Sequence, residues 1–400
     1  HQSTTPVTDV NASGAVTGTS YTGGLVGRAR TGVINASASG DVTSTSGGYA
    51  GGLVGYLNAY DDEVVRAVKA TGNVSAGSAH VGGLVGYVDQ NSGSDEVTMS
   101  DAHATGDVNT TNSGSNAYVG GLVGRFHESR DLTDVSATGD VTSATGSYVG
   151  GLVGRLRMEN GNQVVSNVSA TGNVTTTGDR IGGLIGSHED GQTISNATAT
   201  GDVSTAGDYV GGLVGRTRAS ITNATASGEV TTNGQRVGGL VGYLDAYSDE
   251  EVRTVTATGN VSAGGQYVGG LIGYVDRSGT NAQYHEVAMS DAHATGNVTT
   301  TYAGASNAYV GGLVGRFRDS KHVSDVSATG DVTSESGNEV GGLIGRLRQD
   351  STAYDLRNAS ATGDVTTTGQ KVGGLIGYHT GGSVETSYAR GNVSTDGDYV

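Results

Sequence analysis

Small apolar and polar residues alternate along a segment that returns throughout the chain. In the segment D-V-S-A-T-G-D-V at 134–141, the apolar side is formed by Val135, Ala137, Gly139 and Val141, and polar residues fill the positions between them. A period of two is typical of a β-strand with one buried face. The pattern returns at 167–174 and 358–365. It predicts strands whose buried face consists of small side chains.

A second recurring segment contains the string G-G-L-[VI]-G. At 148–157 it reads Y-V-G-G-L-V-G-R-L-R, in which Leu152, Gly154 and Leu156 alternate with Val153 and two arginines. This predicts a second strand, and the glycine pair with its β-branched neighbours disfavours a helix. Glycines inside strands mark bends or close approach of two backbones. We therefore expect the string to form a corner at which no Cβ fits.

The string repeats along the whole chain. It begins at twelve glycines that are 27 to 42 residues apart, namely Gly23, Gly51, Gly82, Gly120, Gly150, Gly182, Gly211, Gly238, Gly269, Gly311, Gly341 and Gly373. Units of about 30 residues with variable length are typical of stacked coils joined by loops. The sequence predicts an all-β fold, a β-solenoid of about 12–13 stacked coils of roughly 30 residues, each with two or three short strands. We expect one continuous body over 1–400, open at both ends.

A longer period lies above the short one. Y-L-N-A-Y at Tyr56 returns as Y-L-D-A-Y at Tyr243, and M-S-D-A-H-A-T-G at Met99 returns at Met289; the offsets are 187 to 191 residues. This predicts a six-coil super-repeat of about 188 residues, with blocks at approximately 23–210 and 211–400. Such a duplication lengthens a rod without creating a pocket, which favours a stalk or fibre over an enzyme.

Composition narrows the function classes. The chain has 71 Gly, one Pro, no Trp and 34% hydrophobic residues, which predicts a thin core of Val, Leu, Ile and Ala. The net charge is -17 with only three Lys, which fits a salt-adapted organism or simply an acidic secreted protein. Nucleic acid would be repelled, so it is excluded as a partner. There is no Cys, which excludes disulfides and thiol chemistry.

Patterns of membrane spans and signal peptides bear on where the protein is located. No apolar run reaches the length of a membrane span, and the N-terminus has no signal peptide pattern. The given sequence stops at Tyr399 and Val400, after which another string is expected to begin. We expect an extracellular or cell-surface region whose export information lies outside this segment.

One position in the first segment is mostly Asn or Asp. Ten of thirteen copies carry Asp9, Asn35, Asp101, Asp134, Asn167, Asn196, Asn223, Asp291, Asp325 or Asn358, and the exceptions are Ala67, Thr254 and Thr386. Side-chain ladders or Asx-turns explain this preference. A row of calcium ligands is the alternative, which the neutral Asn residues weaken.

The position after each string, and the position two residues further, form a candidate interaction face. Its residues are Arg28, Arg30, Arg125, Arg155, Arg157, Arg216, Arg218, Arg316, Arg318, Arg346, Arg348, Tyr56, Tyr87, Tyr243 and Tyr274. Arg after the string is followed two residues on by a basic residue, and Tyr by Asn58, Asp89, Asp245 or Asp276. Two hypotheses remain: stacking of Arg and Tyr between coils, or lateral docking of basic patches on acidic patches of a neighbouring copy.

Candidate metal and catalytic residues are few. Acidic loops contain Asp61, Asp62 and Glu63, then Asp95 and Glu96, then Asp249, Glu250 and Glu251. They are expected to be solvated loops; weak Ca²⁺ binding is the first alternative and a paired-carboxylate glycosidase site the second. No other cofactor is expected.

Histidine patterns do not indicate a zinc protease. The pairs His127-Glu128, His188-Glu189 and His285-Glu286 lack the second His of that motif. His103 and His293 occupy equivalent positions in the two blocks and are expected to be exposed and not to bind metal.

Twelve N-x-[ST] sequons are candidate glycosylation sites. They lie at Asn11, Asn35, Asn73, Asn109, Asn167, Asn173, Asn196, Asn223, Asn260, Asn297, Asn358 and Asn392.

The twelve copies of G-G-L-[VI]-G give the chain a resemblance to the GLUG-motif family over nearly its whole length. The resemblance implies a β-solenoid in a bacterial or archaeal surface or secreted protein, and it implies no reaction. We expect a structural or adhesive rod, a stalk or shaft, that is not an enzyme. Alternatives are a filament or sheath subunit that assembles through solenoid ends or lateral faces, and the non-catalytic part of a secreted hydrolase. Expected partners are further copies, neighbouring surface proteins and glycans.

Overall fold

The computed structural model describes residues 5–60, 62–90, 96–111, 114, 117–127, 130–158, 163–277, 286–304, 308–318 and 320–396. These residues form strands, turns and bends without a helix, so none of them belongs to a helix that could cross a membrane. Internal packing divides the chain into two compact units, His1–Gly201 and Asp202–Val400. The predicted single body and its block boundaries stay predictions.

One coil of the first unit shows how the repeat folds. The D-V-S-A segment ends β17 (Leu132–Ala137), the chain bends at Gly139, and β18 (Val141–Ser143) follows. The string then connects β19 (Tyr148–Gly150) to β20 (Val153–Arg157). Each coil therefore has four strands. The expectation of two or three was wrong, because both segments that we interpreted as single strands break at glycine corners.

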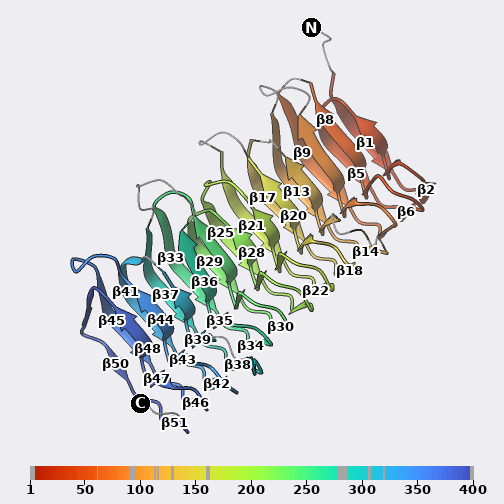
Figure 1. Cartoon of the computed structure of the whole chain (residues 1–400). Helices are drawn as coiled ribbons and strands as arrows, with labels where there is room; N and C mark the ends of the chain where they lie inside the picture. The colour runs from red at the N-terminus through yellow and green to blue at the C-terminus, as the bar shows by residue number, and fades with distance from the viewer. Residues whose placement is uncertain are drawn as a thin grey trace. The chain divides into compact units, whose positions relative to one another are not determined.

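In the first unit, each strand pairs in parallel with its equivalent in the next coil, which gives four parallel sheets (Figure 1). Sheet A contains β1 (Val7–Ala12), β5 (Val33–Ala38), β9 (Glu63–Ala70), β13 (Val97–Ala104), β17, β21 (Val165–Ala170) and β25 (Ile194–Ala199). Sheet B contains β2 (Val16–Gly18), β6 (Val42–Ser44), β10 (Val74–Ala76), β14 (Val108–Thr110), β18 and β22 (Val174–Thr175).

The string lies between the other two sheets of this unit. Sheet C contains β3 (Tyr21–Gly23), β7 (Tyr49–Gly51), β11 (His80–Gly82), β15 (Tyr118–Gly120), β19 and β23 (Ile181–Gly182). Sheet D contains β4 (Val26–Ala29), β8 (Val54–Ala59), β12 (Val85–Gln90), β16 (Val123–His127), β20 and β24 (Ile185–His188).

The second unit repeats this plan. Its sheet A contains β29 (Ile221–Ala226), β33 (Glu250–Ala257), β37 (Val287–Ala294), β41 (Ser320–Ala328), β45 (Asp355–Ala361) and β49 (Ser383–Glu385), and β50 (Tyr388–Ala389) also pairs with β45. Its sheet B contains β26 (Val203–Ser204), β30 (Val230–Thr232), β34 (Val261–Ala263), β38 (Val298–Thr300), β42 (Val332–Ser334), β46 (Val365–Thr367) and β51 (Val393–Thr395).

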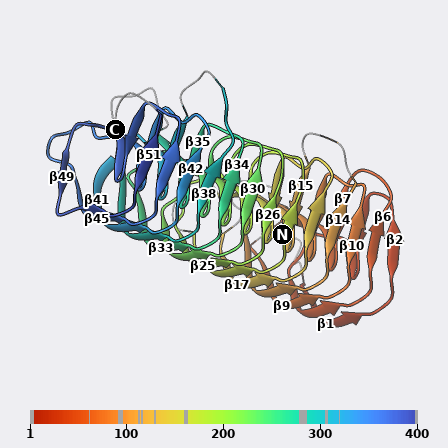
Figure 2. The same ribbon diagram turned by 90° about the horizontal axis from the view of Figure 1, so that it is seen from below.

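Sheets C and D of the second unit again flank the string. Sheet C contains β27 (Val210–Gly211), β31 (Val237–Gly238), β35 (Tyr267–Gly269), β39 (Tyr309–Gly311), β43 (Glu339–Gly341) and β47 (Lys371–Gly373). Sheet D contains β28 (Val214–Thr217), β32 (Val241–Ala246), β36 (Ile272–Arg277), β40 (Val314–Phe317), β44 (Ile344–Arg348) and β48 (Ile376–Thr380). Within each unit, Figure 2 shows the strands of sheet A next to one another, and likewise those of sheet B. The predicted all-β solenoid is confirmed.

The core follows the alternation in the sequence. Val135, Ala137 and Val141 are at most 1% exposed, and the polar residues between them face solvent. The expected alternation in the second segment was wrong at one place: Leu152 and Val153 are both fully buried, because the chain bends at Gly151 and Leu152 and turns both side chains inward.

The glycine corner is a place of close approach. A Cβ on Gly151 would lie 2.1 Å from the carbonyl oxygen of Gly183 in the next coil, and its backbone has no positive φ. Space, and not an unusual backbone angle, therefore requires glycine here, as the sequence predicts.

The Asn and Asp position of sheet A has a different cause. All thirteen copies, including Ala67, Thr254 and Thr386, have φ between 48° and 58°. This left-handed region is accessible to Asn and Asp at the lowest cost among non-glycine residues. The predicted ladder is also present in part: Asn167 Nδ2 donates to Asp134 Oδ1 over 2.9 Å, and Asn196 Nδ2 donates to Asn167 Oδ1 over 3.1 Å.

Candidate functional site

The corner at the string brings two rows of side chains together. One row lies two residues before the glycine pair, at the start of sheet C, and the other follows the string in sheet D. Arg155 of sheet D thus lies over the ring of Tyr148 of the same coil, with 5.4 Å from its guanidinium carbon to the ring centroid. It also lies over Tyr118 of the preceding coil at 5.9 Å. We call these two rows together the corner column.

In the first unit the corner column is a stack of aromatic rings. Tyr49 and Tyr56 have centroids 4.8 Å apart, and Tyr118 and Tyr148 also lie 4.8 Å apart. His80 lies 4.9 Å from both Tyr87 and Tyr118. Because each ring covers the face of the next, the stack joins successive coils, which adds to the backbone ladders.

Arginines fill the places between these rings. Arg125 lies over Tyr87 at 5.1 Å and over Tyr118 at 5.3 Å, and Arg180 lies over Tyr148 at 5.0 Å. Each guanidinium that contacts rings of two coils forms a cation–π bridge between layers. Stacking between coils, one of the two hypotheses for this face, is therefore present.

The second unit uses more charge in the same column. Arg236 stands in the row before the string and contacts three rings, with 4.8 Å to the centroid of Tyr209. Further along, Glu339 replaces the tyrosine and is only 1% exposed. Its carboxylate lies 3.0 Å from Lys371 Nζ and 3.6 Å from Arg346 Nε, so two cations compensate its burial.

Burial fixes the protonation of the column. It raises the pKa of Tyr274 to about 12 and raises the pKa of Tyr56, Tyr87 and Tyr243 as well. It lowers the pKa of His80 to about 4. At neutral pH these phenols and the imidazole are therefore uncharged.

The basic and acidic residues that stand two positions after the Arg or Tyr that follows the string bind one another within each unit. His127 Nδ1 lies 3.0 Å from Asp89 Oδ1, and Arg157 lies 3.2 Å from His127 Nε2. Burial works to raise the pKa of Asp89, but the hydrogen bonds from His127 and Tyr87 outweigh it and hold that pKa below its usual value.

The same pairing occurs in the second unit. Asp245, 3% exposed, binds Arg216 at 2.7 Å and Arg218 at 3.1 Å. Arg318 lies 3.2 Å from Asp276 Oδ1. Neighbouring coils therefore neutralise the alternating charges, which leaves less of them for docking on another molecule.

Four predicted face residues remain to be placed. Arg28 lies over Tyr56 at 5.3 Å, and Arg30 lies over Tyr60 at 4.9 Å. Arg316 lies over Tyr309 at 5.0 Å, and Arg348 Nε lies 3.0 Å from Asp350 Oδ1.

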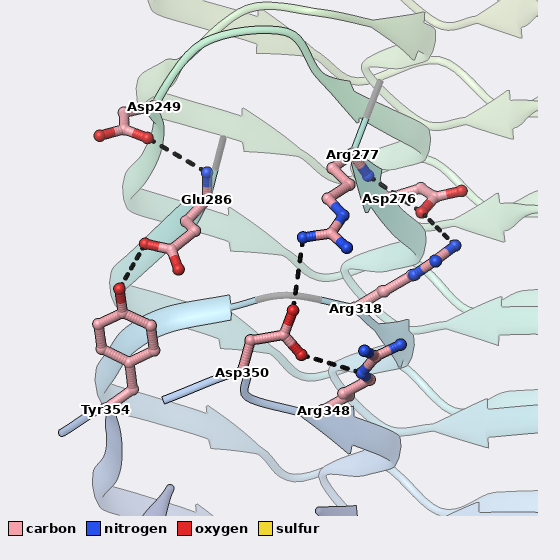
Figure 3. A network of polar contacts seen from close by, with 8 residues as sticks. All are labelled: Asp249, Asp276, Arg277, Glu286, Arg318, Arg348, Asp350 and Tyr354. Atoms are coloured by element: carbon pink, nitrogen blue, oxygen red, sulfur yellow. Dashed lines mark hydrogen bonds and ion pairs between the residues drawn. The ribbon is translucent and has the colours of Figure 1, made fainter. Parts of the chain in front are cut away.

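The acidic loops carry their own cations. Figure 3 shows Glu286 between Asp249 and Tyr354 in the second unit, and Tyr354 donates to Glu286 over 2.7 Å. Lys321 Nζ lies 2.6 Å from Asp249 and 3.8 Å from Glu286. The figure also shows Arg277 and Arg348 on either side of Asp350.

The first unit has an equivalent arrangement, in which Arg130 lies 3.7 Å from Asp62 and 3.2 Å from Glu96. Asp61 and Asp95 lie outside the described residues. Over the described ranges, no group of three or more His, Asp or Glu is arranged to hold a metal ion. Weak Ca²⁺ binding by these loops stays a prediction.

The expectation of solvated loops was wrong for Glu63 and Glu250, which are buried, hydrogen-bonded and each the first residue of a sheet A strand. Glu63 accepts from the backbone N–H of Gly32, and Glu250 accepts from the hydroxyls of Ser220 and Ser248 over 2.8 and 2.6 Å. They position the beginning of the long sheet A strands, whereas Glu251 is exposed and pairs with Arg253.

The histidines have separate environments. His103 is partly exposed and bonds Ser136 Oγ at 2.8 Å and Asp101 at 3.1 Å, and His293 repeats this with Ser327 and Asp291. His188 is fully buried in sheet D, and burial lowers its pKa to about 4. Glu128 and His285 lie outside the described residues.

The glycosylation candidates occupy two recurrent places. Five lie at the left-handed position of sheet A: Asn35, Asn167, Asn196, Asn223 and Asn358. Five follow the T-G or R-G corner before sheet B: Asn73, Asn173, Asn260, Asn297 and Asn392. Asn11 lies in β1 and Asn109 in β14.

Sequence reasoning missed one half of the corner column. The row before the string contains Tyr21, Tyr49, His80, Tyr118, Tyr148, Tyr209, Tyr267 and Tyr309. The recurrence of Tyr two residues before the glycine pair was a visible signal for it. The burial of Glu339 had no such signal, because a single Glu in a repeat is usually exposed.

Comparison with known proteins agrees with this repeat. The GLUG motif matches four stretches, residues 177–204, 206–231, 233–262 and 368–394. In an alignment of length 338 that covers 82% of this chain, the sequence is 65% identical to halomucin of Haloquadratum walsbyi. The aligned part spans 4% of the length of halomucin. No solved structure matches the chain.

The motif matches fall on the glycine corners and on the strands that flank them. The twelve strings, the four-strand coils and these matches agree with one another. The chain is therefore a GLUG-motif repeat region, similar over most of its length to a segment of halomucin.

Proposed function

We propose that this chain is an extracellular, non-catalytic structural region that adds length to a surface protein of a salt-adapted organism, as a shaft or stalk. The observation that carries the proposal is that polar and aromatic side chains of one coil contact those of the neighbouring coils. In the corner column, Tyr and Arg contact the equivalent rows of neighbouring coils, as Arg125 does with Tyr87 and Tyr118. Side chains that join layers serve stacking, and they are not gathered around a pocket.

The similarity to halomucin supports the extracellular part of this proposal, because that name denotes a mucin-like protein. The acidic composition supports the salt-adapted part, since exposed carboxylates keep a surface hydrated at high ionic strength.

We do not propose that the face after the string is adhesive. The residues that we expected to dock on other molecules are the ones that pair within each unit, such as Asp245 with Arg216 and Arg218.

The test is to insert a second copy of the chain into its surface protein in the native host. Electron microscopy with a label at the outer end of that protein measures the reach from the membrane. We expect the reach to grow by about 5 Å for each added coil, the spacing of neighbouring strands, while surface attachment of the cells stays the same. An unchanged reach, or attachment that rises with copy number, would contradict a purely length-adding role.

A further inference from the structure

Two of the corner sequons differ from three left-handed sequons in whether the side-chain amide nitrogen is engaged. At the left-handed position of sheet A, the amide nitrogen is engaged. Asn167 Nδ2 donates to Asp134 Oδ1 over 2.9 Å, Asn358 Nδ2 donates to Asp325 Oδ1 over 3.1 Å, and Asn35 Nδ2 donates to Asp9. These are charge-assisted hydrogen bonds, which are stronger than neutral ones.

At the corner before sheet B, the side-chain oxygen is engaged instead. Asn73 Oδ1 accepts the backbone N–H of Asp107 over 2.9 Å, and Asn297 Oδ1 accepts that of Asp331 over 2.9 Å. Within the described part of the chain, Nδ2 of these two residues has no hydrogen-bond partner, and both side chains are exposed. An N-glycan leaves the side-chain carbonyl in place, so this ladder is compatible with glycosylation.

The other corner sequons differ in this respect. Asn260 Nδ2 donates to Glu229 over 3.2 Å, and Asn392 Nδ2 donates to Asp364 over 3.1 Å. The corner class thus contains members with an engaged nitrogen as well as Asn73 and Asn297.

The strand that follows the corner also presents the complete sequon outward. In N-V-S at 73–75, Val74 is 1% exposed and its neighbours point the other way, because successive side chains of a strand alternate between faces. The layers on either side of Asn73 carry Asp41 and Asp107 at the same position, whereas Asn297 lies between Asn260 and Asp331.

We propose that Asn73 and Asn297 carry N-linked glycans and that the left-handed sequons Asn35, Asn167 and Asn358 do not. The donor is an oligosaccharide linked through phosphate to a polyprenyl lipid. The bond from Nδ2 to the sugar C1 forms, the bond from C1 to the phosphate oxygen breaks, Nδ2 loses one proton, and the lipid phosphate leaves.

The test is site-resolved glycopeptide mass spectrometry of the full chain, secreted from an archaeal host that N-glycosylates its own surface proteins. We expect most copies to be modified at Asn73 and Asn297, and at least tenfold lower occupancy at Asn35, Asn167 and Asn358. The variant N73D/N297D should lose the glycan mass at these two sites. It should also fold, because Asp already occupies this position in other coils, as at Asp107 and Asp140.

The matched control is N167D, which places at the left-handed position the residue found at Asp134 and should leave the glycan mass unchanged. Glycan on Asn167 or Asn358 at the occupancy of Asn73 would overturn the proposal. So would an unmodified Asn73 and Asn297 while the host's own surface glycoprotein is modified.

Discussion

Each coil places one residue of sheet A in the left-handed region, and the residue type found there reflects the cost of that backbone. Asn and Asp tolerate it because their short polar side chains hydrogen-bond locally. Thr254 adopts the same φ, 53°, with a branched Cβ that makes this conformation unfavourable. The preference seen in the sequence is therefore mainly a backbone requirement, to which the ladder adds.

Replacing Thr254 by Asn should stabilise the protein. We expect T254N to raise the free energy of unfolding by about 1 kcal/mol, because it relieves a left-handed Thr. Urea unfolding followed by circular dichroism measures the change. The control is T256N in the same strand, at a position without positive φ, for which we expect no gain. A T254N midpoint at or below that of the parent would show that Thr is not strained here.

Replacing a corner glycine should lower the free energy of unfolding. G151A places a methyl group 2.1 Å from the carbonyl oxygen of Gly183, so the two coils must separate, and we expect a loss of about 3 kcal/mol or more. Gly14 has no atom within 4 Å of such a methyl group, so G14A should be neutral. Thermal unfolding of both variants tests this; equal melting temperatures would be incompatible with a tight corner.

At the scale of elements, the sequence predicts the strands better than their number. The period of two gives the buried and exposed faces of 134–141 correctly. It does not reveal that Gly139 is a corner, because a glycine on the apolar side of a strand looks like any small residue. The corner at Gly151 was recognised from the doubled glycine, yet its effect on Leu152 and Val153 depends on the angle between two sheets, which no local pattern encodes.

The candidate site was predicted in the same partial way. Arg155 and its equivalents were visible as a recurrent position after the string. Their ring partners stand on another strand, and only the fold of the corner places Tyr148 beneath Arg155. Pairing of Asp245 with two arginines likewise depends on register between coils, which the sequence alone does not fix.

The aromatic stack of the first unit should make stability depend on pH. His80 lies among Tyr49, Tyr87 and Tyr118. Burial lowers its pKa to about 4; the charge of Arg125 also lowers this pKa, and that of Asp89 partly opposes the shift. The unfolded chain binds the proton near pH 6.5, so stability is full above that value. It falls as pH decreases towards 4, by at most about 3 kcal/mol for this group.

The variant H80Y removes this titration and places at the position the residue found at Tyr267 in the second unit. We expect its melting temperature to fall less between pH 7 and pH 4 than that of the parent, while His188 retains its own share of the acid loss. Parallel pH profiles for the two proteins would show that His80 is not a source of acid sensitivity.

At the scale of the whole molecule, charge is concentrated in rows. The net charge is -17, and the corner ladder places Asp107 directly beside Asp140 in adjacent coils. Like charges opposite each other destabilise a sheet. Salt weakens this repulsion, because the screening length is only about 3 Å at 1 M. Acidic rows that stack in register should therefore make the folded state more stable at high salt than at low salt.

Raising NaCl from about 0.1 to 1 M, where the screening length shortens from about 10 to 3 Å, should therefore raise the melting temperature. The variant D107N should gain less from salt, because Asn occupies this position naturally at Asn73 and removes one repulsive pair. Differential scanning calorimetry at both salt concentrations measures the difference. A melting temperature that falls with salt would contradict a dominant role of carboxylate repulsion.

The central claim is that equivalent residues of successive coils lie side by side in parallel register. Thr142 in β18 pairs with Thr175 in β22, and Asn109 in β14 pairs with Thr142, so Asn109 and Thr175 are two layers apart. All three are exposed, and the chain has no cysteine of its own. Disulfides form only when the two Cα atoms are within about 7 Å, whereas two layers span about 10 Å.

Oxidation of paired cysteine variants, followed by peptide mapping under non-reducing conditions, tests this claim most directly. We expect T142C/T175C to form an intramolecular disulfide in nearly every molecule, and N109C/T175C to remain reduced. A T142C/T175C variant that stays reduced, or an N109C/T175C variant that cross-links equally well, would contradict the stacking of these coils.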